Sequence, residues 1–78
     1  MPSAEHVQER IAAAFPGGQV AVVDTTGTGD HFRAVVESAT FEGLSRIDQH
    51  RRVYDAVRAE IADGSIHALS IETRLPAS

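Results

Sequence analysis

Two short runs of β-branched and aromatic residues, separated by a polar loop, constrain the fold of this chain most strongly. The first run spans residues 20–23 and the second spans residues 32–37. Each has the length and composition of a strand, and the loop at 25–30 contains Gly27 and Gly29, so the pair predicts a β-hairpin. The rest of the chain must supply the elements that cover this hairpin.

Helical periodicity marks one segment before the hairpin. Ser3 is a suitable N-cap, and the run Pro16-Gly17-Gly18 is a strong stop signal. The apolar residues between them recur at helical spacing: Val7, Ile11, Ala14 and Phe15. The sequence therefore predicts an amphipathic first helix.

A second helix is predicted after a turn at residues 40–44. Ser45 can cap its start, and Asp63-Gly64 can end it. Three apolar side chains repeat every seven residues and two valines lie beside them: Ile47, Tyr54, Ile61, Val53 and Val57. We expect this set, including Tyr54, to face the core.

Residues 66–73 alternate in the manner of a third strand. One face would carry His67, Leu69 and Ile71, and we expect the helices to cover it. The other face would carry Ile66, Ala68, Ser70 and Glu72.

The predicted order is helix, strand, strand, helix, strand. A helical crossover between the second and third strands is right-handed and makes these strands parallel. The sequence therefore predicts an α+β fold with a mixed three-stranded sheet and helices on one face. A chain of 78 residues buries only about 60–65% of its unfolded surface, so we expect a single domain with one small core.

Composition narrows the classes of function. The net charge is −4, all seven basic residues are arginine, and cysteine is absent, so the chain can offer no thiolate to a metal. No apolar run approaches the length of a membrane span, and we expect a cytoplasmic protein without membrane contact. Motifs such as Gly-x-Ser-x-Gly or His-Glu-x-x-His are missing, which argues against an enzyme.

Two histidines and a group of basic residues are the candidate site residues. His67 at the start of the third strand is either a packed side chain at the sheet edge or a metal ligand, and His31 is either a solvated loop residue or a ligand facing a partner. The basic group on the second helix is His50, Arg51, Arg52 and Arg58. It is a solvated surface, a docking face for an acidic partner, or a phosphate-binding face, although Asp48 and Asp55 are interspersed with it.

Residues 41–54, F-E-G-L-S-R-I-D-Q-H-R-R-V-Y, and residues 65–69, S-I-H-A-L, carry a resemblance to a known family. An aromatic-x-Gly turn, a His-Arg pair leading into Val-Tyr, and a His-Ala-Leu strand start together resemble the BolA-like family. The resemblance covers close to the whole chain, residues 1–78. It implies a fold similar to the second type of KH domain, although the Gly-x-x-Gly clamp of nucleic-acid-binding KH domains is absent.

The resemblance also implies a function. BolA-like proteins are adaptors that form heterodimers with a monothiol glutaredoxin and share a two-iron, two-sulfur (2Fe–2S) cluster with it. The partner contributes its cysteine and a bound glutathione, and the BolA-like chain contributes histidine. The strand-start position of the family falls on His67. The second ligand lies in the hairpin loop, where His31 is the candidate and Thr28 occupies the position used in some members.

Two other interpretations stay open. Some BolA-like proteins have been described as transcriptional regulators, so the alternative function is DNA binding through the arginine-rich helix. Gln49 stands where many members carry an arginine, which weakens that alternative. The chain could also dock on glutaredoxin without metal, and the sequence leaves open whether it forms a homodimer.

Overall fold

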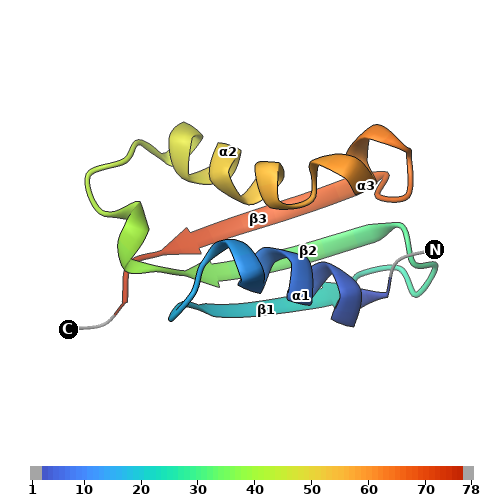
Figure 1. Ribbon diagram of the computed structural model, residues 1–78. Helices are drawn as coiled ribbons and strands as arrows, with labels where there is room; N and C mark the ends of the chain where they lie inside the picture. The colour runs from blue at the N-terminus through green and yellow to red at the C-terminus, as the bar shows by residue number, and fades with distance from the viewer. Residues whose placement is uncertain (1–2, 77–78) are drawn as a thin grey trace.

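The computed structural model describes residues 3–76 and contains three strands and three α-helices (Figure 1). Residues 1–2 and 77–78 of the predicted domain lie outside the described residues. The elements are α1 (Ala4–Ala14), β1 (Gln19–Asp24), β2 (His31–Glu37), the 3₁₀ turn η1 (Ala39–Phe41), α2 (Arg46–Ala56), α3 (Arg58–Ala62) and β3 (Ala68–Arg74). None of the helices within residues 3–76 combines the length and the hydrophobicity that a membrane span requires.

The sheet has the predicted mixed topology. Its strand order is β1-β2-β3, with β1 antiparallel and β3 parallel to the central strand β2. Helix α1 packs on β1 and α2 packs on β3, so the helices share one face of the sheet (Figure 1). The α+β prediction, with helices on one face, is confirmed.

Strand alternation directs the core toward the helices. On β2 the buried residues are Phe32, Ala34 and Val36, while the residues between them face the other side. Val7 and Ile11 cover them from α1, and Phe15 does so from its C-cap, together with Val22, Phe41, Val53, Val57 and Ile66 from other segments. The Ser3 hydroxyl accepts a hydrogen bond from the His6 N–H at 3.1 Å, which confirms the predicted N-cap. Ala14, predicted on the apolar face of this helix, is exposed.

The prediction that the residues repeating every seven positions on the second helix face the core is wrong. Ile47, Tyr54 and Ile61 are 66, 41 and 37% exposed, whereas Val53 and Val57 are fully buried. The helix also breaks at Val57, which separates α2 from α3.

The inward-facing side of these helices contains polar residues as well as valines, so it could not be recognised from apolar spacing. Gln49 lies one turn before Val53, and its amide donates to the Leu44 carbonyl at 3.0 Å and accepts from the Thr73 hydroxyl at 2.5 Å. Glu60 lies one turn after Val57, is 8% exposed, and accepts a hydrogen bond from Arg10 Nε at 3.2 Å. Both side chains face the neighbouring elements although neither is apolar, so a search for apolar residues alone misses the stripe.

The third strand begins two residues later than predicted. Ile66, predicted on the uncovered face, is 4% exposed and belongs to the core, because its N–H still donates to the Glu60 carbonyl of α3 at 3.1 Å. Strand alternation begins only at Ala68, after which Leu69 and Ile71 pack against the core as predicted. His67 therefore lies before the strand, where its side chain is 62% exposed rather than covered by the helices.

Candidate functional site

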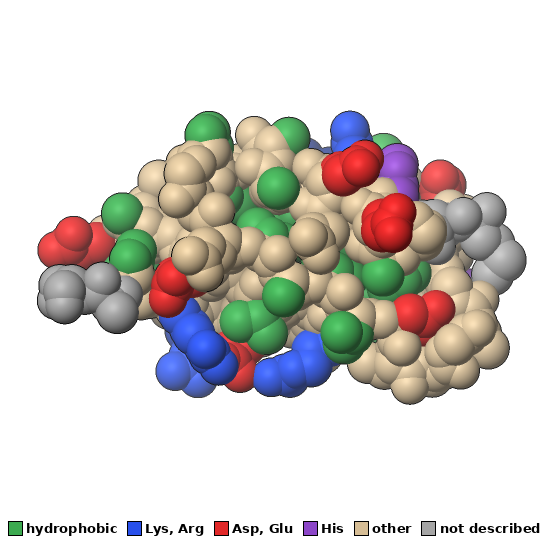
Figure 2. Space-filling view, turned by 90° about the horizontal axis from the view of Figure 1, so that it is seen from below, with side chains coloured by type: hydrophobic (Ala, Val, Ile, Leu, Met, Phe, Trp, Pro, Cys, Tyr) green, Lys and Arg blue, Asp and Glu red, His purple; other side chains and the backbone are tan. Residues whose placement is uncertain are grey.

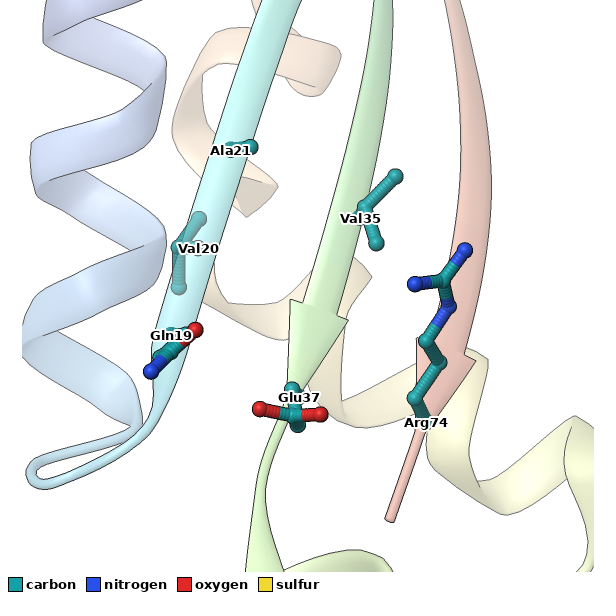
Figure 3. A pocket seen from close by; sticks show the side chains of 6 residues that line it. All are labelled: Gln19, Val20, Ala21, Val35, Glu37 and Arg74. Atoms are coloured by element: carbon teal, nitrogen blue, oxygen red, sulfur yellow. The ribbon is translucent and has the colours of Figure 1, made fainter. Parts of the chain in front are cut away.

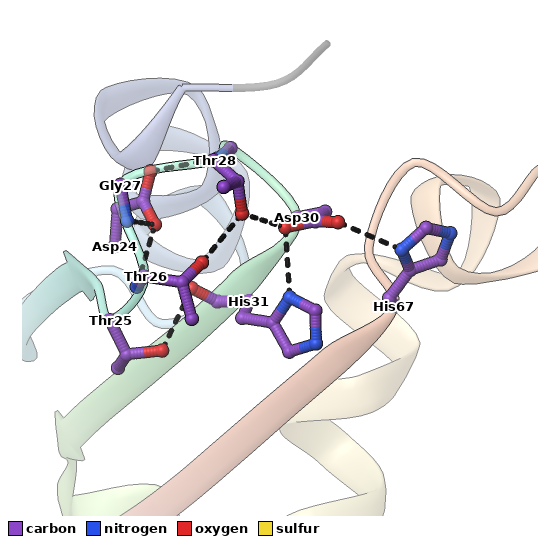
Figure 4. A network of polar contacts seen from close by, with 9 residues as sticks. Asp24, Thr25, Thr26, Gly27, Thr28, Asp30, His31 and His67 are labelled. Atoms are coloured by element: carbon purple, nitrogen blue, oxygen red, sulfur yellow. Dashed lines mark hydrogen bonds and ion pairs between the residues drawn. The ribbon is translucent and has the colours of Figure 1, made fainter.

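The hairpin loop is organised by one carboxylate at the end of β1. Asp24 Oδ1 accepts hydrogen bonds from the N–H groups of Thr26 and Gly27, at 3.3 and 2.9 Å, and Oδ2 accepts one from Gly29 at 2.9 Å (Figure 4). Both glycines have positive φ, a region that other residues rarely adopt. These contacts fix the conformation of the loop and thereby the position of Asp30, just before β2.

Asp30 joins the loop to the start of β3. Its main-chain carbonyl accepts hydrogen bonds from the N–H groups of His67 and Ala68, at 2.8 and 3.2 Å. His31 pairs with Ala68 in the parallel register of β2 and β3. Two histidines that are 36 positions apart in the sequence are thereby brought to the same end of the sheet.

The Asp30 carboxylate lies between the two imidazoles. Oδ1 is 2.8 Å from His31 Nδ1, and Oδ2 is 2.9 Å from His67 Nδ1 (Figure 4). The Thr28 hydroxyl donates a further hydrogen bond to Oδ1. These hydrogen bonds, that of Thr28 first and then those of the two histidines, hold the pKa of Asp30 well below its ordinary range. Asp30 is thus a carboxylate at any physiological pH.

His31 and His67, the histidine pair, form an exposed site. Their ring centroids are 6.1 Å apart with an interplanar angle of 70°, and their side chains are 42 and 62% exposed. Each ring turns Nδ1 toward Asp30, so that Nε2 lies on the far side of the ring (Figure 4). Within residues 3–76, no three histidine, aspartate, glutamate or cysteine side chains are grouped to hold a metal ion. The pair therefore amounts to two nitrogen donors open to an approaching molecule.

Thr28, the alternative position for the second ligand, is also placed by the structure. Thr28 lies behind Asp30 and uses its hydroxyl for hydrogen bonds with Asp30 and Thr26. His31 is the first residue of β2 instead of the last residue of the loop, and it is the residue that lies beside His67.

The predicted basic group does not form one face. His50 lines a hollow beside β3 with Arg33 and Arg46, whereas Arg52 lines another hollow beside the end of α1. Arg51 lies 3.7 Å from Asp48, and Arg58 forms an ion pair with Asp55. The group is divided between different sides of α2 and the start of α3, and two of its arginines have acidic neighbours.

The uncovered face of the sheet carries a third hollow at the end opposite the histidine pair. It is lined by Gln19, Val20, Ala21, Val35, Glu37 and Arg74, at the start of β1 and the ends of β2 and β3 (Figure 3). In Figure 2, arginine and acidic side chains alternate beside apolar side chains along the lower edge of the view. This hollow contains no histidine and has mixed charge.

Sequence reasoning missed Asp30. The signal was present, because Asp30 directly precedes His31, but strand prediction placed it in a flexible polar loop. Its contact with His67 depends on the β2–β3 register and could not be read from adjacent positions.

Comparison with known proteins decides the family. A family model described as "BolA-like protein" matches residues 3–78. This chain belongs to the BolA-like family.

Other BolA-like proteins match in sequence and structure. The uncharacterized protein RP812 of Rickettsia prowazekii is 35% identical over 71 residues, which cover 91% of each chain. BolA-like protein 1 of Bos taurus is 49% identical over 51 residues, but the match covers 65% of this chain and only 37% of the bovine protein. The structure of a BolA homologue from Coxiella burnetii superposes with a TM-score of 0.80 at 34% identity, covering 97% of this chain and 94% of that one.

Proposed function

We propose that this chain is a non-catalytic BolA-like adaptor that binds a monothiol glutaredoxin and shares a 2Fe–2S cluster with it, in cluster trafficking or iron regulation. The observation that carries the proposal is the juxtaposition of His31 and His67, with ring centroids 6.1 Å apart and each Nδ1 turned toward Asp30. Family membership adds the expected partner and cluster.

The donor set of the histidine pair suits a shared cluster. Two imidazoles can replace two thiolates on one iron of such a cluster, and the other iron then needs thiolate ligands. This chain has no cysteine, so those thiolates must come from the partner and its bound glutathione. When bound, the cluster would supply iron and sulfide for transfer or sensing, while His67 and His31 would hold this chain's side of it.

Anaerobic reconstitution tests the proposal. The chain is mixed with a monothiol glutaredoxin, glutathione, ferric iron and sulfide, and the complex is followed by visible absorption and circular dichroism. We expect a heterodimer spectrum that is lost or altered in His67→Ala and altered in His31→Ala. His6→Ala is a matched control, because it removes an imidazole that lies beside Glu60 and is not one of the pair; its spectrum should equal that of the wild type.

Other outcomes identify the competing functions. A heterodimer with an unchanged cluster spectrum in both variants would remove histidine ligation. Binding of glutaredoxin without any cluster would leave a docking module. If no heterodimer forms, DNA binding through Arg51, Arg52 and Arg58 becomes the function to test.

A further inference from the structure

The two histidines share a single carboxylate, and this sharing has a chemical consequence. A carboxylate accepts hydrogen bonds and cannot donate them. Each oxygen of Asp30 lies within 2.9 Å of a different Nδ1 atom. Both short contacts are attractive only if Nδ1 carries the proton in both rings.

The position of that proton determines which nitrogen can bind a metal. A neutral imidazole has one N–H and one lone pair, so a ring protonated on Nδ1 has its lone pair on Nε2. Metal-binding histidines commonly donate their second N–H to a carboxylate, which fixes both the tautomer and the ring orientation. Here one carboxylate performs this role for two rings at once.

Asp30 is itself held firmly enough to orient the rings. Its main-chain carbonyl is bonded to the start of β3, and its side chain accepts from Thr28. The main-chain contacts would survive substitution of the side chain, since any residue at this position has the same carbonyl. The loop attachment and the carboxylate contacts are therefore separable by mutation.

We propose that Asp30 is a positioning residue that keeps the proton on Nδ1 of both His31 and His67, so that both Nε2 lone pairs face the ligand. Its use in cluster binding rests on the proposed function, but the tautomers are a property of this chain alone. The expected ligand atoms are Nε2 of His67 and Nε2 of His31.

Asp30→Asn separates this role from a purely structural one. An asparagine has nearly the same shape, but only one of its two terminal atoms is an acceptor. Because the two rings contact different terminal atoms of residue 30, one ring would then face the NH₂ group, which is a donor. At least one ring should then change to the Nε2–H tautomer, while the loop attachment remains. Asp48→Asn removes the same charge at the start of α2 and serves as the control.

The tautomers are measured in the isolated, ¹⁵N-labelled chain by long-range ¹H–¹⁵N correlation of the imidazole rings. The spectra are recorded at about pH 8, above the ordinary titration range of histidine. We expect Nδ1–H in both rings of the wild type and of Asp48→Asn, and Nε2–H in at least one ring of Asp30→Asn. Backbone amide spectra establish that each variant is folded.

Two results would overturn the proposal. One is an Nε2–H tautomer in either ring of the wild type, and the other is an unchanged tautomer pattern in folded Asp30→Asn. If the tautomers behave as expected but no cluster forms with glutaredoxin, the proposal stands and the proposed function fails. If both hold, Asp30→Asn should retain the cluster with roughly 10- to 100-fold lower affinity, the loss typical of a removed ligand-orienting group.

Discussion

On the scale of single residues, Glu72 is the acidic centre of the uncovered face of the sheet. Its Oε1 accepts a hydrogen bond from Arg33 Nη2 at 2.8 Å, and its Oε2 accepts from the Arg74 guanidinium. The Arg74 hydrogen bond and charge, followed by the charge of Arg33, hold the pKa of Glu72 below its ordinary value of 4.5. These three residues neutralise much of one another's charge on a face that the helices leave open.

The lowered pKa of Glu72 predicts a pH-dependent contribution to stability. A carboxyl whose pKa is lower in the folded state stabilises the fold at pH values above its unfolded pKa, and this contribution is lost as pH falls through the folded value. We expect Arg74→Gln to raise the pKa of Glu72 toward 4.5, with Arg51→Gln as the control for loss of one arginine. Side-chain carboxyl titration by NMR measures it. An unchanged pKa in Arg74→Gln would show that the ion pair is absent in solution.

On the scale of elements, helix α2 has two different apolar sides. Val53 and the C-cap residue Val57 face the core, while Ile47 and Tyr54 face outward. The Tyr54 hydroxyl donates to the Leu69 carbonyl at 3.3 Å. Two polar residues, Gln49 and Glu60, extend the inward stripe by contacting neighbouring elements. Burial on this helix is therefore decided by contacts across the fold more than by the pattern of its own residues.

Two substitutions on α2 test this assignment. Val53→Ala removes two buried methyl groups and leaves a cavity, so it should lower the free energy of unfolding by about 2–3 kcal/mol. Ile47→Ala removes a larger side chain from the surface and should change it by less than about 0.5 kcal/mol. Both replace a β-branched residue with alanine in the same helix, so the gain in helix propensity is similar.

Urea unfolding followed by circular dichroism measures both free energies. Equal losses in the two variants would contradict the assignment, as would a greater loss in Ile47→Ala. The latter result would favour the stripe that the seven-residue repeat predicts.

Element types were largely predictable from the sequence, whereas the contacts between elements were not. The hairpin, the Ser3 cap and the parallel third strand follow from local composition and the handedness of crossovers. The exposed position of His67 depends on where the chain leaves α3, and the role of Asp30 depends on the register of β2 and β3. Local sequence patterns could therefore predict neither the exposure of His67 nor the role of Asp30.

On the scale of the whole molecule, the candidate site and the basic side chains are separated. The histidine pair lies at the starts of β2 and β3, whereas the arginines are distributed over the three helices and the uncovered sheet face. Three arginines outside the site form ion pairs with Asp55 or Glu72. With a net charge of −4, the molecule therefore offers no extended positive surface among its described residues.

This distribution predicts weak binding to DNA. A face that used Arg51, Arg52 and Arg58 against three phosphates would make the logarithm of the binding constant fall with the logarithm of salt concentration with a slope of about −3. Because two of these arginines lie beside acidic residues, we expect no saturable binding to duplex DNA at physiological salt. Fluorescence anisotropy of a labelled duplex, titrated with the chain at several salt concentrations, measures both quantities. Saturable binding with a slope near −3, reduced in Arg52→Gln but retained in His67→Ala, would favour the DNA-binding function. Ligation by the histidine pair predicts instead that His67→Ala affects cluster binding and that Arg52→Gln does not.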